Sequence, residues 1–503
     1  MKRKTKWLVP ICSIVVALSL VSCGTAAEEE VVVPPEEEEI VTEEEVVAPP
    51  PEEEEIVVEE EEEAPPPEEE EVTEEEEAAQ LEEEEVAPPT DTTPPSAITG
   101  LIAVDAYDGK VNLWWDVSTA EDFDHYNIYS AESAIVDVTG ITPVHEVGDL
   151  TNISYQVTGL ELETGYYFAV TAVDRSGNES TLVASVSATP TPMPRGTVDP
   201  DIYVDVYQSD RAWAGTTLLP DNHNPESPRV IEVNMLGEII WEYQLPQNLR
   251  QYTNPGFDVE LLPNNNILLV LPGYGVHETN RNGDTVWSYL DKKVSHDADR
   301  LPNGNTLVVY GNDDGINDAQ VKEINPEGEI VWAWYAKDHF YESPYKDIYD
   351  QGWTHTNAVT RLPNGNTLIS LRNFNLIVEV DSKGSVIRTI GEGILEYQHD
   401  PEVLSDGNIL VANHVTPHQA VEIDPKTGRV VWKSAGFEQD ITPVRDANRL
   451  PNGNTLITGT TRIFEVTTEG ETVWQLSLKG VVFETPKERP ARGFYKAERI
   501  GIQ

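Results

Sequence analysis

Cysteine is nearly absent from this sequence. Its 503 residues include only two cysteines, Cys12 and Cys23, and both lie close to the N-terminus. Small secreted domains often compensate for a thin core with a framework of disulfides. The rest of this chain has no such option, so its domains must be stabilised by their hydrophobic cores alone.

Basic residues are also scarce. The chain has 33 Lys and Arg against 90 Asp and Glu, a formal net charge of -57. Such a charge repels phosphate, which argues against nucleic acid as a partner. Between Glu28 and Glu85, blocks of glutamate alternate with VVVPP and APPP, without any Lys or Arg. Because such a segment repels itself and buries little apolar surface, we expect residues 23–95 to form a disordered Glu/Pro-rich stalk. An acidic cation-binding segment is the alternative.

A long hydrophobic run is missing as well. The apolar stretch WLVPICSIVVALSLVS (7–22) follows the basic MKRKTK and is too short for a confident membrane-spanning helix. It ends at Cys23 in LVSC, which resembles a bacterial lipobox. The resemblance implies a signal peptide over 1–22, lipidation of Cys23, and a membrane-anchored lipoprotein in the periplasm or at the cell surface. An ordinary signal peptide with a chance cysteine is the alternative.

Residues 96–190 alternate apolar and polar side chains in short runs, such as GKVNLWWDV and YYFAVTAVD, with turn residues between them. This pattern predicts a β-sandwich, with Trp115 and Tyr126 in its core. Tyr166, six residues after Leu160, has the form of a tyrosine corner. The segment resembles a fibronectin type III domain, a module that spaces or binds and rarely catalyses. The Pro-rich stretch ATPTPMPRG (188–196) then reads as a linker.

An octapeptide recurs in the remainder of the chain. RLPNGNTL occurs at 300–307, 361–368 and 449–456, and looser copies are LLPNNNIL (261–268) and VLSDGNIL (403–410). The shared leucines are spaced by 39, 61, 42 and 46 residues, at Leu262, Leu301, Leu362, Leu404 and Leu450. Forty-odd residues suit the four short strands of one propeller blade. We therefore predict an all-β chain with a six-bladed β-propeller over 197–503.

Each repeat has the same expected order of strands. A short first strand meets the Asn-Gly turn of the octapeptide, and two further strands lead to a fourth that carries a tryptophan. We expect these tryptophans to pack between blades: Trp241, Trp287, Trp332, Trp432 and Trp474. The C-terminal YKAERI matches HDADRL (296–301) position for position, so we expect it to close the ring as the first strand of blade one. The widest spacing reflects an insertion at 337–353, a candidate binding loop.

The first strands of all blades start at one rim of the central channel. The residues at these starts are Tyr495, Phe257, His296, Asn357, His399 and Arg445. His355 lies two residues before Asn357 and hence on the same side of its strand. The second strands end at the same rim, and they contribute Arg372 and His414. The aspartates that follow the starts recur in four blades (Asp258, Asp297, Asp400 and Asp446), which indicates a scaffold role.

Two chemistries fit three histidines and an arginine. Histidine clusters bind Zn²⁺, Cu²⁺ or Fe²⁺, but Arg372 would oppose the charge of a metal, and this face offers no obvious carboxylate. The other chemistry is oxyanion transfer, in which Arg372 holds a sulfate or phosphate group and a neutral histidine attacks it. Arg372 favours the second chemistry. A merely polar, wet channel is the alternative to a functional site.

The segments that carry these residues resemble the bacterial arylsulfate sulfotransferases. They are SHDADRLPNGNTLVV (295–309), HTNAVTRLPNGNTLISLRN (355–373) and QHDPEVLSDGNILVANH (398–414), within a resemblance that spans 205–500. The resemblance implies a six-bladed propeller that moves a sulfuryl group from an aryl sulfate ester to a phenol. The family works by a ping-pong route through a sulfated histidine, without a cofactor.

The resemblance also assigns roles to residues of this chain. It implies that His399 is the nucleophile, that Arg372 and His355 hold the sulfuryl oxygens, and that His296 exchanges a proton with the phenolic oxygen. Asn357, Tyr495 and His414 are expected to bind substrate. Rim aromatics could stack on an aryl ring or serve only for packing: Trp353, Phe374, Tyr397 and Tyr495.

The chain departs from the family in two respects, and two other functions are alternatives to sulfuryl transfer. The best-known family members have their own N-terminal β-domain and a disulfide, whereas this chain has a fibronectin-like module and no disulfide. One rival is a non-catalytic propeller that binds a glycan or another ligand. The other is a quinoprotein or metal-dependent enzyme, because GEIVW and GETVW are also found in quinoprotein propellers. Those propellers usually have eight blades, and six are counted here.

Overall fold

The computed structural model describes residues 91–182, 184–254, 256–414, 417–437, 443–479 and 492–501. All of them belong to one compact unit, Val86–Gln503. The predicted signal peptide, Cys23 and the predicted stalk up to residue 90 lie outside the described residues. In the described part of the chain, no helix is long and apolar enough to cross a membrane.

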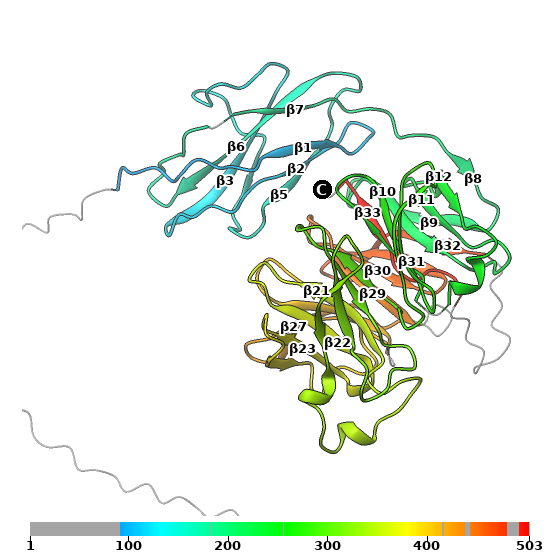
Figure 1. The fold of residues 1–503 in the computed structure, drawn as a ribbon. Helices are drawn as coiled ribbons and strands as arrows, with labels where there is room; N and C mark the ends of the chain where they lie inside the picture. Colours follow the sequence, from blue (N-terminus) through cyan, green and yellow to red (C-terminus); the bar gives the residue numbers. More distant parts are fainter. Residues whose placement is uncertain are drawn as a thin grey trace, which may run out of the picture. The chain divides into compact units, whose positions relative to one another are not determined.

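The described regular elements are β-strands and four short 3-10 helices, so the predicted all-β class is confirmed. The strands form two sheets over residues 102–188 and six sheets beyond them (Figure 1). The 3-10 helices are η1 (Arg250–Tyr252), η2 (Ala336–Asp338), η3 (Tyr345–Asp347) and η4 (Arg372–Phe374).

The first two sheets form a seven-stranded β-sandwich. One contains β1 (Ile102–Asp105), β2 (Val111–Trp114) and β5 (Ser154–Val157), and the other contains β4 (His145–Val147), β3 (Phe123–Ala131), β6 (Tyr166–Asp174) and β7 (Val186–Ala188). Trp115 and Tyr126 are buried in its core, as predicted, with ring centroids 5.4 Å apart. The Tyr166 hydroxyl accepts a 3.2 Å hydrogen bond from the Glu161 backbone N–H, so the tyrosine-corner contact is present.

The other six sheets are antiparallel, and we call them blades 1 to 6. Their strands, from innermost to outermost, are as follows. Blade 1 has β33 (Glu498–Ile500), β10 (Thr216–Asp221), β11 (Arg229–Val233), β12 (Glu238–Gln244) and β8 (Thr197–Val198); blade 2 has β13 (Asp258–Leu261), β14 (Ile267–Leu271), β15 (Gly275–Thr279) and β16 (Thr285–Leu290); blade 3 has β17 (Ala298–Arg300), β18 (Thr306–Val309), β19 (Val321–Ile324) and β20 (Ile330–Trp334). Blade 4 has β21 (Thr356–Arg361), β22 (Thr367–Leu371), β23 (Leu376–Val380) and β24 (Val386–Ile390); blade 5 has β25 (His399–Val403), β26 (Ile409–Asn413), β27 (Gln419–Asp424) and β28 (Arg429–Lys433); blade 6 has β29 (Val444–Arg449), β30 (Thr455–Gly459), β31 (Arg462–Val466), β32 (Thr472–Leu478) and β9 (Ile202–Tyr207).

The ring is closed at both ends of the chain. The C-terminal β33 pairs with β10, where Arg499 lies opposite Thr217, which confirms that the C-terminal strand completes blade 1. At the outer edge of blade 6, β9 pairs with β32, where Tyr207 lies opposite Trp474. In these two sheets β33 covers the edge of β10, and β9 covers the edge of β32.

Burial along the blades explains their composition. The second strands, for example β14 (ILLVL) and β22 (TLISL), are buried at every position because neighbouring blades cover both of their faces. The fourth strands lie towards the outside of the blades, and β28 (RVVWK) is mostly exposed. A continuous apolar run therefore marks an inner strand of this fold.

The octapeptide links consecutive blades. Its arginine stacks on a tryptophan of the preceding blade and pairs with a glutamate of that blade's third strand. Three arginines of the octapeptide and the matching Arg499 do so: Arg300 on Trp287 with Glu278, Arg361 on Trp332 with Glu323, Arg449 on Trp432 with Glu422, and Arg499 on Trp474 with Glu465. The turn glycine, such as Gly304 with a φ of 88°, has a left-handed backbone, and Asn265 replaces it in blade 2.

The tryptophans pack between blades as predicted, with one correction in blade 3. In four blades the indole N–H of the predicted tryptophan donates to a carbonyl of the next blade, as Trp474 does to Met235. In blade 3 this donor is Trp334, which bonds the Gly384 carbonyl at 3.0 Å, rather than the predicted Trp332. Trp332 instead stacks under Arg361.

Candidate active site

Residues from five blades meet around a small cavity in the propeller channel. They come from the starts of the innermost strands, which converge because the sheets are arranged in a ring. The cavity has a volume of about 10 Å³ and is lined by His296, Asp297, Asn357, His399, Asp400, Arg445, Tyr495 and Lys496. The structure thus brings together four predicted site residues: His296, Asn357, His399 and Tyr495.

The other predicted residues lie beside this cavity rather than in its wall. The His355 ring is 4.8 Å from the His296 ring in an edge-on arrangement, and the His414 ring is 4.7 Å from the His399 ring. The Arg372 guanidinium is stacked 4.3 Å from the centre of the Tyr397 ring. Burial is the largest cause of the lowered pKa values of His355 and His399. The positive charge of Arg372 lowers both values further, and for His399 the charge of His414 contributes more than that of Arg372.

The backbone of the site has an uncommon conformation. Four residues other than glycine have positive φ angles here: His296 (60°), His355 (46°), Tyr397 (52°) and Asp400 (49°). Such angles cost free energy and are concentrated at functional sites. Gly256 makes the His296 conformation possible, because a Cβ at this position would lie 2.7 Å from the His296 Cα. The rim is therefore shaped by local strain, whereas the octapeptide turns place glycine at their left-handed position, with Asn265 as the exception.

Hydrogen bonds orient two of the histidine rings. The His399 Nδ1 lies 3.0 Å from the Tyr397 carbonyl oxygen, and the His355 Nδ1 lies 3.0 Å from the Gln351 carbonyl oxygen. Because a carbonyl only accepts, Nδ1 must carry the proton in both rings. In the neutral ring the lone pair is then on Nε2, which is the atom available for nucleophilic attack.

Burial keeps these rings neutral. His296, His355 and His399 are 2%, 4% and 6% exposed. Burial lowers the pKa of His355 to about 4, and it holds the pKa values of His296 and His399 well below 6.5. The nucleophilic form of histidine therefore predominates at neutral pH.

Arg372 is the predicted anion-binding cation, and it is only loosely paired. Its side chain is 12% exposed, and it lies 3.7 Å from the half-exposed Asp350 carboxylate. Its guanidinium donates a 3.0 Å bond to the Asn373 side-chain oxygen. Because a 3.7 Å pair is longer than a charge-assisted hydrogen bond, this guanidinium retains donors for a ligand.

The recurring aspartates serve the scaffold, in part through a lysine that the sequence analysis overlooked. Asp297 and Asp446 accept backbone N–H bonds from the next blade, from Val359 at 2.7 Å and Ala497 at 3.1 Å. Lys496 stands where four other blades have aspartate, and its Nζ lies 3.1 to 3.7 Å from Asp400, Asp297 and Asp258. The replacement of aspartate by lysine at this position of the repeat could have identified Lys496 from the sequence.

Two of the four rim aromatics serve for packing. Trp353 and Phe374 are 3% and 6% exposed and belong to the hydrophobic core of blades 3 and 4. The Trp353 indole donates to the Tyr345 carbonyl within the insertion, which packs against blade 4 instead of forming an open loop. Tyr397 is half-buried and faces Arg372, so it remains a candidate for an aryl contact.

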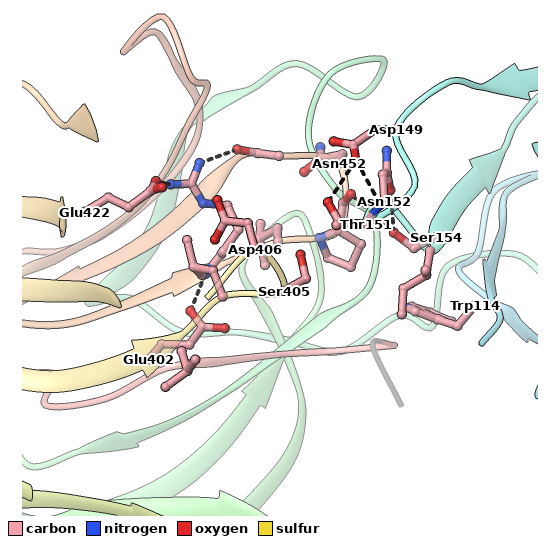
Figure 2. A pocket seen from close by; sticks show the side chains of 17 residues that line it. Trp114, Asp149, Thr151, Asn152, Ser154, Glu402, Ser405, Asp406, Glu422 and Asn452 are labelled. Carbon is pink, nitrogen blue, oxygen red and sulfur yellow. Dashed lines mark hydrogen bonds and ion pairs between the residues drawn. The ribbon is translucent and has the colours of Figure 1, made fainter. Parts of the chain in front are cut away.

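A larger pocket, with a volume of about 440 Å³, lies away from the histidines. It is lined by sandwich residues such as Trp114 and Asp149 and by octapeptide residues of blades 5 and 6 (Figure 2). Arg449 in its wall pairs with Glu422 at 2.6 Å, and the backbone N–H of Arg449 donates to Glu402. Because this pocket contains none of the predicted site residues, it is not a candidate for the transfer chemistry.

One group of side chains in the described part of the chain has the spacing of a metal-ligand set. Among the described residues, one group of three acidic, histidine or cysteine side chains has ligand atoms within 4.8 Å of one another: Asp91, Asp122 and Asp174. That group lies at the sandwich, and the histidine site contributes no such group.

Comparisons with solved structures give weak likenesses. A protein of unknown function from Bacteroides caccae is 18% identical, with a TM-score of 0.41, over 56% of this chain and 97% of that chain. BamB from Moraxella catarrhalis is 11% identical, with a TM-score of 0.28, over 75% and 98%. The sixth fibronectin type III domain of human fibronectin type III domain containing protein 3 is 15% identical, with a TM-score of 0.18, over 22% and 97%. No curated protein matches the chain.

A family model provides the sequence-level assignment. Residues 206–394 match the model described as Arylsulfotransferase (ASST). This span contains His296, His355, Asn357 and Arg372 and ends before His399. The match supports aryl sulfotransferase activity in general, and it confirms the resemblance for the two motifs that lie within 206–394. Residues 206–394 of the chain are thus similar to the arylsulfotransferase family.

Proposed function

We propose that the chain transfers a sulfuryl group from an aryl sulfate ester to a phenol through a sulfated His399. The observation that carries this proposal is the state of His399. It is buried and neutral, and its Nδ1–H is bonded to the Tyr397 carbonyl, which leaves the Nε2 lone pair at the cavity. A fixed neutral imidazole beside a guanidinium suits nucleophilic attack on a sulfate ester.

In the first half-reaction, His399 Nε2 forms a bond to sulfur while the bond between sulfur and the aryl oxygen breaks. The departing phenoxide takes a proton, from water in the first turnover and afterwards from His296. Arg372 and His355 hold the sulfuryl oxygens, so the charge that develops in transfer is stabilised by fixed donors. The product is a phenol, and the sulfuryl group remains on His399.

In the second half-reaction the acceptor phenol attacks the same sulfur. His296 accepts the phenolic proton, because burial keeps this ring neutral before the step. The bond between sulfur and His399 breaks, and the aryl sulfate product leaves. Asn357, Tyr495 and His414 are assigned to substrate binding, since the first two line the cavity and the third flanks His399.

The test is sulfuryl transfer from p-nitrophenyl sulfate to phenol by the chain from Gly24 onward. Release of nitrophenol should depend on phenol, and His399→Ala should lower it by on the order of a thousandfold or more. His145→Ala, at an exposed sandwich position, is the matched control and should keep full activity. Release that persists in a folded His399→Ala protein would remove the nucleophile. No release from the folded wild type with several donors would favour a ligand-binding propeller.

The proposed location rests on the N-terminal sequence. We propose that Cys23 is lipidated, so that the protein is anchored outside the cytoplasm with the acidic stalk and sandwich between the membrane and the propeller. Incorporation of labelled palmitate into the wild type, and its loss in Cys23→Ala, is the expected result. Equal label in both proteins would contradict the anchor.

A further inference from the structure

Arg445 differs from the other buried arginines of the propeller in having no acidic partner. It is 7% exposed, and within the described ranges it makes no hydrogen bond or ion pair. Its one neighbour of note is the Tyr495 ring, whose centre lies 5.0 Å from the guanidinium carbon. In contrast, the fully buried Arg499 lies 3.1 Å from the Glu465 carboxylate. A buried cation without an anion is unfavourable unless a ligand supplies one.

Tyr495 has the same property. It is 7% exposed, and its buried hydroxyl has no hydrogen-bond partner among the described residues. Buried hydroxyls without partners are rare in folded proteins and require an explanation. Two adjacent donors, Arg445 and Tyr495, thus lack an acceptor.

Both donors line the 10 Å³ cavity that also contains His296 and His399. A volume of this size holds a single water molecule, or one oxygen atom of a ligand. Arg445 lies close enough to lower the pKa values of both histidines, although burial is the larger cause. The unpartnered donors are therefore directed at the place where the reacting group would lie.

The carboxylates in the cavity wall are already occupied. Asp297 and Asp400 lie 3.4 Å and 3.1 Å from the Lys496 ammonium. Asp297 also accepts the backbone N–H of Val359. Burial raises the pKa of Asp297 and so favours its neutral form, which leaves Lys496 beside the Asp400 carboxylate. Among the described residues no carboxylate forms an ion pair with Arg445, so its guanidinium has no anionic partner.

We propose that this cavity is a second anion position of the site, in which Arg445 and the Tyr495 hydroxyl hold one oxygen of a tetrahedral oxyanion. This assignment deepens the proposed function, and the role of the anion position in catalysis rests on that function. While the bond from His399 Nε2 to sulfur forms and the bond to the aryl oxygen breaks, Arg445 and Tyr495 hold one non-bridging sulfuryl oxygen. They bind that oxygen on the side of blades 6 and 1, and Arg372 binds the group from blade 4. Neither residue gives up or receives an atom.

Binding of inorganic sulfate tests the proposal without the need for turnover. Sulfate affinity is measured by calorimetry and by thermal stabilisation of the chain from Gly24 onward, with chloride at equal ionic strength as the reference. Arg445→Gln is expected to weaken sulfate binding at least tenfold, and Tyr495→Phe is expected to weaken it by a smaller factor. Arg211→Gln, an exposed arginine paired with Glu471, is the matched control and should bind sulfate as the wild type does.

The outcomes separate this proposal from the proposed function. Unchanged sulfate affinity in a folded Arg445→Gln protein overturns the second anion position, even if the wild type transfers sulfuryl groups. Sulfate binding that depends on Arg445, in a chain without transferase activity, supports the position and counts against the transferase. If Arg445→Gln does not fold, Arg445→Lys and Tyr495→Phe decide the question. Arg445→Lys should keep more affinity than any neutral substitution, and a Tyr495→Phe protein with wild-type affinity would contradict the proposed contact.

Discussion

The two ends of the innermost strands contrast sharply. At the octapeptide end, blades repeat the same contacts, and each arginine has both a tryptophan and a glutamate as partners. At the histidine end, neighbouring blades supply different residues, and buried groups such as the His296 Nδ1 and the Tyr495 hydroxyl lack partners in the described structure. Each arginine at the octapeptide end has one buried nitrogen without a hydrogen-bond partner, but its charge is matched by a carboxylate. At the histidine end the contacts vary between blades, and the unpartnered groups are available to bind a ligand.

The largest expected effect is a loss of stability from a substitution at the octapeptide end. Arg499→Gln removes the charge from an ion pair in which both side chains are fully buried, and it leaves Glu465 without a cation. We expect the free energy of unfolding to fall by about 3 kcal/mol, because breaking a buried pair strands the other charge. Urea unfolding measures the loss. Transfer activity per folded molecule should not change, and a loss of activity without a loss of stability would contradict the division between the two ends.

The converse substitution is at the histidine end. Arg372→Gln should lower kcat/KM for sulfuryl transfer about a hundredfold, the usual cost of removing one donor to a developing charge. The free energy of unfolding should change little, because Arg372 is only loosely paired with Asp350. Steady-state kinetics and urea unfolding of the same preparation provide both values. Unchanged kinetics would exclude Arg372 from the site.

A third experiment titrates the histidine end. Burial lowers the pKa of His355 to about 4, whereas an unfolded histidine has a pKa near 6.5. The folded state then binds fewer protons, so stability is complete above pH 6.5 and falls as the pH drops towards 4. Relative to His355→Asn, the wild type should lose about 1.2 kcal/mol between pH 6 and pH 5. A constant difference between the two proteins would show that His355 is not held neutral.

The smallest expected effect concerns a buried carboxyl near Lys496. Burial raises the pKa of Glu498 to about 7, against 4.5 for an exposed glutamate, and the Leu261 N–H bonds its oxygen at 2.8 Å. The stabilising contribution of this carboxyl is present below pH 4.5 and is lost as the pH rises through 7. Glu498→Gln keeps the acceptor, and it should be more stable than the wild type by about 0.8 kcal/mol at pH 5 and equally stable at pH 4. Thermal unfolding at both pH values checks the crossover, and a gain at pH 4 would contradict it.

Most of the fold could be predicted from the sequence because of the repeat. The octapeptide placed each hairpin turn, and the match of YKAERI to HDADRL located the closing strand before any contact was known. The outer strands β8 and β9 were not expected. The pairing of β9 with β32 joins segments that meet only in the closed ring, and β8 is a two-residue strand that pairs with β12. In blade 3 the interblade donor is Trp334, since the choice between two tryptophans depends on which one faces the next blade.

The candidate site could be predicted in part from the sequence. The position of each strand start in its repeat identified His296, Asn357, His399 and Tyr495, which line one cavity. Arg445 was at an equivalent position but was not selected, because its significance lies in the absence of a partner rather than in its residue type. Lys496 was overlooked, although it replaces an aspartate that recurs in four blades.

The sequence by itself determined the class of the fold, the turns and the repeat, because these depend on local periodicity and on residues close together in the chain. Only the tertiary structure decided which polar groups are paired. Lys496 reaches aspartates of three other blades, and the protonated nitrogen of His399 follows from one carbonyl oxygen. The contacts of Lys496 join segments that only ring closure brings together, whereas the His399 bond is local and depends on the backbone conformation at Tyr397. Burial then sets the charge of each histidine and arginine at the rim.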